Sequence, residues 1–221
     1  MLNRDTRRAL VILEFVISFI TPALAQKLSG QLLTRSVSLP AEYASISEHL
    51  VTIFKSAAIS GGIALVNNDC TPEAKEHFSE FKGSVHDALA TLVPLNGGHQ
   101  LHWREGAGTL VIYNSSGPPP LLTVIVAEFR FSRKEPLSET SSALLDIPEV
   151  ANEASKLNII EYGPELGFAQ LPARTTAADT VTVTNVSVLD ILNKIAMPHA
   201  VWLYKQSQCE RNIVSLNWPI R

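Results

Sequence analysis

The sequence predicts an α+β fold of two tandem small units, each with a helix pair packed on a mixed sheet. Three observations support this class. The pattern Ser-Val-x-Asp-x-Leu occurs twice, at residues 84–89 and 187–192. Behind each copy, the apolar residues follow the 3.6-residue period of a helix. After each helix comes a segment rich in β-branched and aromatic residues, which is typical of a hairpin.

The N-terminus has the order of a secretory signal peptide. Three arginines precede an apolar run, and the small-residue triplet Ala-Leu-Ala ends at Ala25. This order predicts export to the periplasm or secretion, with residues 1–25 removed by cleavage after Ala25. Glu14 is unusual in such an apolar segment because a charge there is costly in the bilayer. A retained N-terminal anchor is therefore the alternative.

Composition excludes several classes of protein. The chain has 221 residues, with 18 basic against 21 acidic side chains and 46% hydrophobic content. Three basic and two acidic residues lie in the leader, so the mature chain would carry a net charge of −4. This charge does not favour nucleic acid as a partner, and the hydrophobic content does not favour disorder. No run after the leader reaches the roughly 20 apolar residues of a membrane span.

The first predicted unit covers residues 37–116. Its helix near residues 45–58 is expected to stop at Gly61-Gly62, which we interpret as turn glycines. Its second helix begins after Ser84, and a Gly-rich turn at residues 106–108 joins the final hairpin. The strands are expected at residues 37–39, 63–66, 99–103 and 109–113.

The second, more divergent unit covers residues 121–221 and follows a Gly-Pro-Pro-Pro linker. Residues 132–147 are interpreted as an extra excursion, and residues 205–212 as a polar loop within the final hairpin. Whether the two units are independent domains stays open. The expected strands are 121–131, 158–162, 199–204 and 213–218, with helices near 148–157 and after Ser187.

Both repeated helices carry the same capping signal. Ser84 and Ser187 occupy predicted N-cap positions, and Asp87 and Asp190 follow three residues later. We interpret each pair as a capping box, which satisfies backbone N–H groups that a helix start leaves without partners.

These segments resemble the secretin and TonB-dependent-receptor short N-terminal (STN) domain. The matching pieces are residues 81–89 and, more weakly, 183–192. The resemblance implies the order strand, helix, two strands, helix and closing hairpin. It also implies a periplasmic, non-catalytic module that passes signals to a partner or packs into an assembly ring.

No catalytic or cofactor-binding motif is present, so we predict no catalytic residue, no cofactor and no metal. His99 and His102 would point to opposite faces of a strand. Glu73 and His77 have helical spacing, but a third ligand is lacking. The histidines are therefore expected at the surface or at edges.

Two residue types leave alternatives open. Cys70 and Cys209 would form a disulfide in an oxidising compartment, or would stay two independent thiols. Trp103, Trp202 and Trp218 would fill the core, or would form a platform for a ligand.

The predicted function is that of an exported envelope protein acting by non-catalytic protein contact, in signalling or assembly. Small open sheets have unpaired edges, so edge-strand pairing or helix-face packing is the expected mode. The partner would be an envelope protein or another copy of the chain. A small-ligand-binding protein, with its site between the two units, is the main alternative. An undetected hydrolase is the third hypothesis.

Overall fold

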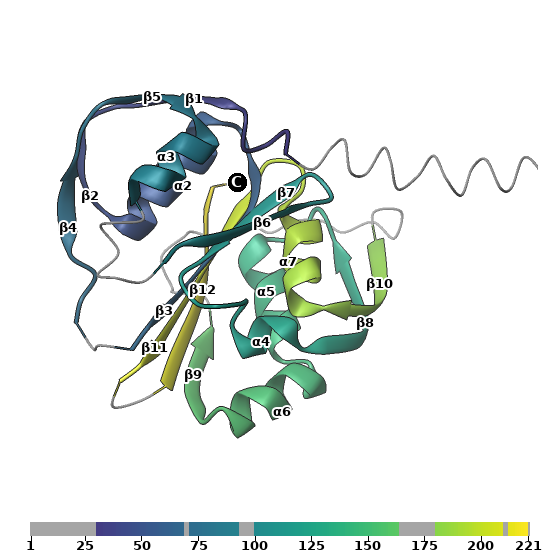
Figure 1. Ribbon diagram of the computed structural model, residues 1–221. Coiled ribbons are helices and arrows are strands. Elements are labelled where there is room, and N and C mark those ends of the chain that lie inside the picture. The colour runs from purple at the N-terminus through teal and green to yellow at the C-terminus, as the bar shows by residue number, and fades with distance from the viewer. Residues whose placement is uncertain (1–29, 69–70, 93–99, 164–179, 210–211, 221) are drawn as a thin grey trace, which may run out of the picture.

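The computed structural model describes residues 30–68, 71–92, 100–163, 180–209 and 212–220. The predicted leader therefore lies outside the described residues. The α+β class is confirmed: a six-stranded mixed sheet runs through the molecule, and helices pack on both of its faces (Figure 1). None of the described helices is long and apolar enough to cross a membrane.

The first unit contains two helices, and the segment predicted only as a connection between them is extended. Its elements are β1 (Ser36–Leu39), β2 (Glu42–Ser45), α2 (Ile46–Ser56), β3 (Ser60–Asn67), β4 (Lys75–Phe78), β5 (Phe81–Ser84), α3 (Val85–Leu92), β6 (His102–Gly106) and β7 (Thr109–Tyr113).

The second unit follows the same order, with additional helices. Its elements are α4 (Pro120–Thr123), β8 (Ile125–Ser132), α5 (Leu137–Leu145), α6 (Pro148–Lys156), β9 (Ile159–Gly163), β10 (Thr180–Ser187), α7 (Val188–Ala196), β11 (Val201–Gln208) and β12 (Asn212–Ile220).

Strand pairing repeats between the units. In the first, β1 pairs with β5 and β2 with β4, so that a curved antiparallel ribbon arches over α2 and α3 (Figure 1). In the second, β8 and β10 form the equivalent antiparallel ribbon. The remaining strands have the order β6-β7-β3 in one unit and β11-β12-β9 in the other. In both, an antiparallel hairpin is extended by a parallel strand.

The two three-stranded sheets join edge to edge. Strand β3 pairs in parallel with β11, from Gly61 opposite Val201 to Asn67 opposite Ser207. The central sheet therefore has the order β6-β7-β3-β11-β12-β9. We call the β3–β11 pair the seam. Edge pairing, which the sequence predicts as a way to contact a partner, is used here within one chain.

Gly61 and Gly62 belong to strand β3, so their interpretation as turn glycines is wrong. A Cβ atom on Gly62 would lie 1.9 Å from the indole of Trp202, which is its register partner in β11. A Cβ atom on Gly61 would lie 1.9 Å from the Leu110 carbonyl oxygen of β7. A side chain at Gly61 would therefore collide with the backbone of β7, and one at Gly62 would collide with the Trp202 ring.

The sheet separates two hydrophobic cores, and each core contains residues of both units. Helices α2 and α3 cover the face that carries Ile63 and Ile112, and Val201 of the second unit belongs to that core. The second unit's helices cover the opposite face, where Ala64 and Val111 of the first unit are buried. Neither unit encloses its core by itself, because alternate residues of a strand face opposite sides.

The helix caps have the predicted residues in closely similar geometry. Ser84 and Ser187 each accept the backbone N–H of an aspartate, Asp87 or Asp190, at 3.1 Å. The aspartates do not complete a capping box. Their carboxylates instead accept the serine hydroxyl, at 2.6 and 2.7 Å, because Asp is one methylene shorter than Glu.

A capping box that the sequence analysis missed begins α2. Glu48 accepts the backbone N–H of Ser45 at 2.8 Å and donates its own N–H to the Ser45 hydroxyl. That backbone N–H lowers the pKa of Glu48, and the Ser84 hydroxyl likewise lowers the pKa of Asp87. Hydrogen bonds to a carboxylate stabilise its charged form.

Three local predictions need correction. The run from residue 121 is not one strand, because Pro120 starts the short helix α4 and β8 begins only at Ile125. The excursion at residues 132–147 contains α5. The polar loop expected from residue 205 continues as strand β11 to Gln208, because β3 pairs with it.

Polar residues of β11 alternate between the two faces. Gln206 is buried. Its side-chain oxygen accepts the Tyr204 hydroxyl, and its NH₂ group donates to the side-chain oxygen of Asn212, each at 2.9 Å. Asn212 in turn donates to the Leu157 carbonyl at 2.7 Å. Burial raises the pKa of Tyr204. A satisfied network lets polar side chains sit inside a core.

The seam generates the first prediction. Gly62→Ala should lower the free energy of unfolding by about 2 kcal/mol or more, because the indole must move to admit the new methyl group. Gly106→Ala is the control, because a Cβ atom there meets nothing within 4 Å. Chemical denaturation measures both. Equal stability of the two variants would contradict the packing argument.

The caps generate the second prediction. Ser187→Ala should cost about 1 kcal/mol of unfolding free energy, whereas Ser155→Ala, at an exposed position in α6, should change it little. Ser84→Ala should raise the pKa of Asp87 towards its ordinary value, measured by NMR titration. Since a lowered carboxyl pKa stabilises only above that pKa, the stabilisation is lost as the pH falls through it.

Candidate binding site between the two units

A hollow of about 300 Å³ lies between the β6–β7 hairpin of the first unit and helix α7 of the second. We call it the joint pocket. It is lined by Arg104, Gly106, Ala107, Thr109, Val111, Val186, Leu189, Asp190, Asn193, Lys194 and Met197.

The joint pocket follows from the way the units share one sheet. The hairpin's own helices cover the face with Leu110 and Ile112. Its other face carries Val111 and Thr109, with Arg104 and Gly106 as their register partners in β6. Helix α7 packs across β3 on that second face. The hollow remains where α7 meets the hairpin.

The apolar and polar parts of the pocket come from both units. Val111 and Leu189 are buried, whereas the side chains of Arg104, Asp190 and Lys194 are exposed. Asp190 accepts the Ser187 hydroxyl as part of the helix cap. Within the described ranges, neither Arg104 nor Lys194 forms an ion pair. Two cations therefore line a hollow in which Asp190 is the one carboxylate among the described lining residues.

Two of the three predicted tryptophans fill the core. Trp202 is fully buried, and its indole N–H donates to the Asn193 carbonyl oxygen at 3.1 Å. Trp218 is buried and donates to the Ser141 hydroxyl at 3.2 Å. Trp103 is partly buried against the first core, with its ring edge-on to His86. Trp202 does not line the joint pocket, but it hydrogen-bonds Asn193, which does.

One histidine contradicts the predicted surface location. His49 on α2 is 3% exposed, stacks on Phe78 with ring centroids 3.9 Å apart, and bonds Glu42 through Nδ1 at 2.6 Å. A carboxylate partner makes its burial tolerable. In the part of the chain that the structure describes, no three His, Cys, Asp or Glu side chains gather as a metal site would require. His99 lies outside those residues.

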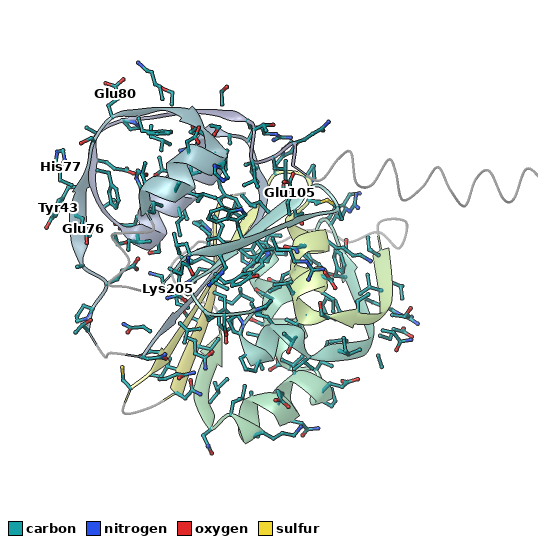
Figure 2. The ribbon with its side chains drawn as sticks, viewed as in Figure 1. Tyr43, Glu76, His77, Glu80, Glu105 and Lys205 are labelled. Carbon is teal, nitrogen blue, oxygen red and sulfur yellow. The ribbon has the colours of Figure 1, made fainter. Side chains whose placement is uncertain are left out.

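Glu73 joins the two units instead of pairing with His77 on a helix. Its carboxylate accepts the Ser47 N–H and hydroxyl, at 2.5 and 2.7 Å, and pairs with Lys205 of β11 at 3.0 Å. Figure 2 shows Lys205 close to the seam, whereas His77 lies on the outer side of the curved ribbon, beside Tyr43. Tyr43 is 69% exposed. Neither Tyr43 nor His77 lines the joint pocket.

In the sequence, each cysteine follows one strand of the seam, Cys70 after β3 and Cys209 after β11. Cys209 is disulfide-bonded. Cys70 is the only other cysteine of the chain, and it lies outside the described residues. The register places Asn67 opposite Ser207, shortly before the two cysteines. The bond between Cys70 and Cys209 therefore stays a prediction, which this register supports.

Most residues of the joint pocket were missed by sequence reasoning. The sequence singles out Asp190 only as a helix cap, and Gly106 and Ala107 only as part of a turn. Arg104, Asn193 and Lys194 belong to no motif, because the pocket exists only when segments from two units meet. A site between the units was expected as an alternative, without its residues.

Comparisons with protein-family models, with curated proteins and with solved structures find no match for this chain.

The cysteines generate the third prediction. Non-reducing peptide mapping should find Cys70 linked to Cys209. Reduction, or Cys209→Ser, should lower the stability by up to about 4–5 kcal/mol in the chain-entropy model, because the closed loop exceeds 100 residues. Ser207→Ala is the control, since it removes only a hydroxyl that contacts the Cys209 sulfur. A mapped intermolecular bond would contradict the prediction.

Proposed function

We propose that this protein is an exported, non-catalytic binding module of the bacterial envelope that acts by contact with another protein. When the short helix α4 is set aside and β1–β2, β4–β5 and α5–α6 are each counted as one element, both units follow the order strand, helix, strand, strand, helix and hairpin. This order supports the resemblance to STN domains, and with it a role in signalling or assembly. The leader sequence supports a periplasmic or secreted location.

The observation that carries this proposal is the free edge at β6. This strand ends the six-stranded sheet, and only a two-residue turn joins it to β7. In such a hairpin, Gly106 and Thr109 bond each other, so the backbone groups of Trp103 and Glu105 face away from β7. Among the described residues, no backbone partner pairs with these groups. An extended segment of a partner could add there as a strand.

The seam supports strand addition as the mode of contact. The edges of β3 and β11 already join two similar units in parallel along seven residue pairs. The same kind of unit therefore accepts a strand at its sheet edge. The side chain of Glu105 does not fill the edge, because its carboxylate holds the backbone N–H groups of Gly30 and Leu32, at 2.7 and 2.8 Å (Figure 2).

The fourth prediction tests the β6 edge. Cross-linking in living cells, followed by mass spectrometry, should identify a partner protein or self-association. Glu105→Pro removes an outward backbone N–H and should reduce the cross-linked product by about tenfold, since strand pairing requires that donor. Glu105→Ala is the matched control, because it loses the same carboxylate but keeps the N–H.

Circular dichroism should show that both variants fold. Equal cross-linking of the Pro and Ala variants would exclude β6 as the docking edge. The absence of any protein cross-link in the native protein would overturn the protein-contact proposal as a whole.

The second candidate function is the binding of a small ligand. The joint pocket supports it, because its volume is at the low end of the range of ligand pockets and its walls come from both units. This function could coexist with docking at β6, because Arg104 and Gly106 line the pocket while the backbone of their neighbours faces the free edge.

A further inference from the structure

The polar groups directed at the joint pocket are mainly hydrogen-bond donors. Arg104 comes from β6 of the first unit, and Lys194 from α7 of the second. Guanidinium and ammonium groups donate hydrogen bonds and cannot accept them. In the described part of the chain, neither side chain has an ion-pair partner. A ligand that enters between them must therefore supply acceptors.

Asn193 adds a third donor, and its orientation is fixed by Trp202. An indole N–H can only donate, so the oxygen of the Asn193 amide must face it, at 3.1 Å. The NH₂ group of the same amide then points elsewhere, and no hydrogen bond to it occurs among the described residues. Because Asn193 lines the pocket, this NH₂ group is available to an acceptor on a ligand.

The acidic residue of the pocket does not cancel this preference. Asp190 accepts the Ser187 hydroxyl at 2.7 Å, and the same hydroxyl caps the helix. With Arg104 and Lys194 positively charged and Asp190 negatively charged, the lining residues carry a net charge of +1. The Thr109 hydroxyl donates its proton to the Gly106 carbonyl oxygen at 2.8 Å, so it has no donor left for a ligand.

The rest of the lining is apolar. Val111 and Leu189 form buried walls, and Val186 and Met197 are half-buried beside them. A purely ionic ligand, such as inorganic phosphate, would leave these walls uncovered. A ligand with a short apolar body and one anionic end would cover the walls and meet the donors, which is the usual composition of a small-molecule site.

We propose that the joint pocket binds a small organic anion, a carboxylate on a short apolar chain. Its carboxylate lies among Arg104, Lys194 and the Asn193 amide, and its chain lies on Val111 and Leu189. This inference rests on the second candidate function, ligand binding, and gives that function a ligand class. It does not depend on docking at β6.

The experiment compares three probes with the same six-carbon body: hexanoate, 1-hexanol and hexylamine. Each is titrated into the purified protein, and binding is followed by NMR chemical shifts of backbone amides. Hexanoate should bind at least about tenfold more tightly than either other probe. The shifts should concentrate on β6, β7 and α7.

Four variants locate the site. Gly106→Leu should abolish hexanoate binding, because Gly106 lines the pocket and the new side chain would fill it. The fold should be kept, because a Cβ atom at this position meets nothing within 4 Å. Arg104→Gln, Lys194→Gln and Asn193→Asp should each weaken it severalfold. Lys156→Gln, which removes an exposed charge on α6, is the matched control and should bind hexanoate like the native protein.

The outcomes separate the ligand class from ligand binding itself. If hexanol or hexylamine binds as well as hexanoate, and Gly106→Leu blocks it, the pocket binds ligands but the anion proposal is wrong. If none of the probes shifts the pocket residues, both the anion proposal and the ligand-binding function are overturned. If Lys156→Gln weakens hexanoate binding as much as Arg104→Gln does, the binding is unspecific charge attraction, and the proposal is overturned as well.

Discussion

The indole of Trp202 occupies the space that a side chain at position 62 would need, and this contact allows the two units to share one sheet. Gly62 and Trp202 face each other across the seam. Beside them, Gly61 permits the close approach of the Leu110 carbonyl oxygen in β7. A side chain at Gly61 would displace the backbone of β7, and one at Gly62 would displace the indole of Trp202. The pairing of β3 with β11, and the division of the core between two faces, depend on this absence of side chains.

The joint pocket is a consequence of the same arrangement. Because the sheet continues across the seam, helix α7 packs against β3 as well as against strands of its own unit. The pocket lies where α7 borders the β6–β7 hairpin. Asn193 connects the two features, since it holds the Trp202 indole on one side and lines the pocket on the other. The same hydrogen bond fixes the amide of Asn193, because its oxygen must face the indole N–H.

The two units use the same local devices with different neighbours. Ser84 and Ser187 begin equivalent helices with closely matching bonds to an aspartate. Trp103 and Trp202 occupy the same place in equivalent hairpin strands, yet only Trp202 is fully buried. The difference arises because β11 is an inner strand of the joined sheet, whereas β6 is at its edge. In the second unit this strand is paired with β3 across the seam, whereas its equivalent in the first unit ends the sheet.

Local signals in the sequence determined the α+β class, the repeated helices and their caps, and the hairpin turn at Ala107–Gly108, because capping, helical period and turn chemistry act between residues close in the chain. Only the tertiary structure explains the glycines at 61 and 62, because the atoms that would collide with a side chain there belong to Leu110 and Trp202, far away in the sequence. It also decided that Lys205 and Gln206 continue a strand, because the partner β3 lies in the other unit. Arg104, Asn193 and Lys194 meet for the same reason: a site assembled across a seam leaves no spacing within either segment that could reveal it.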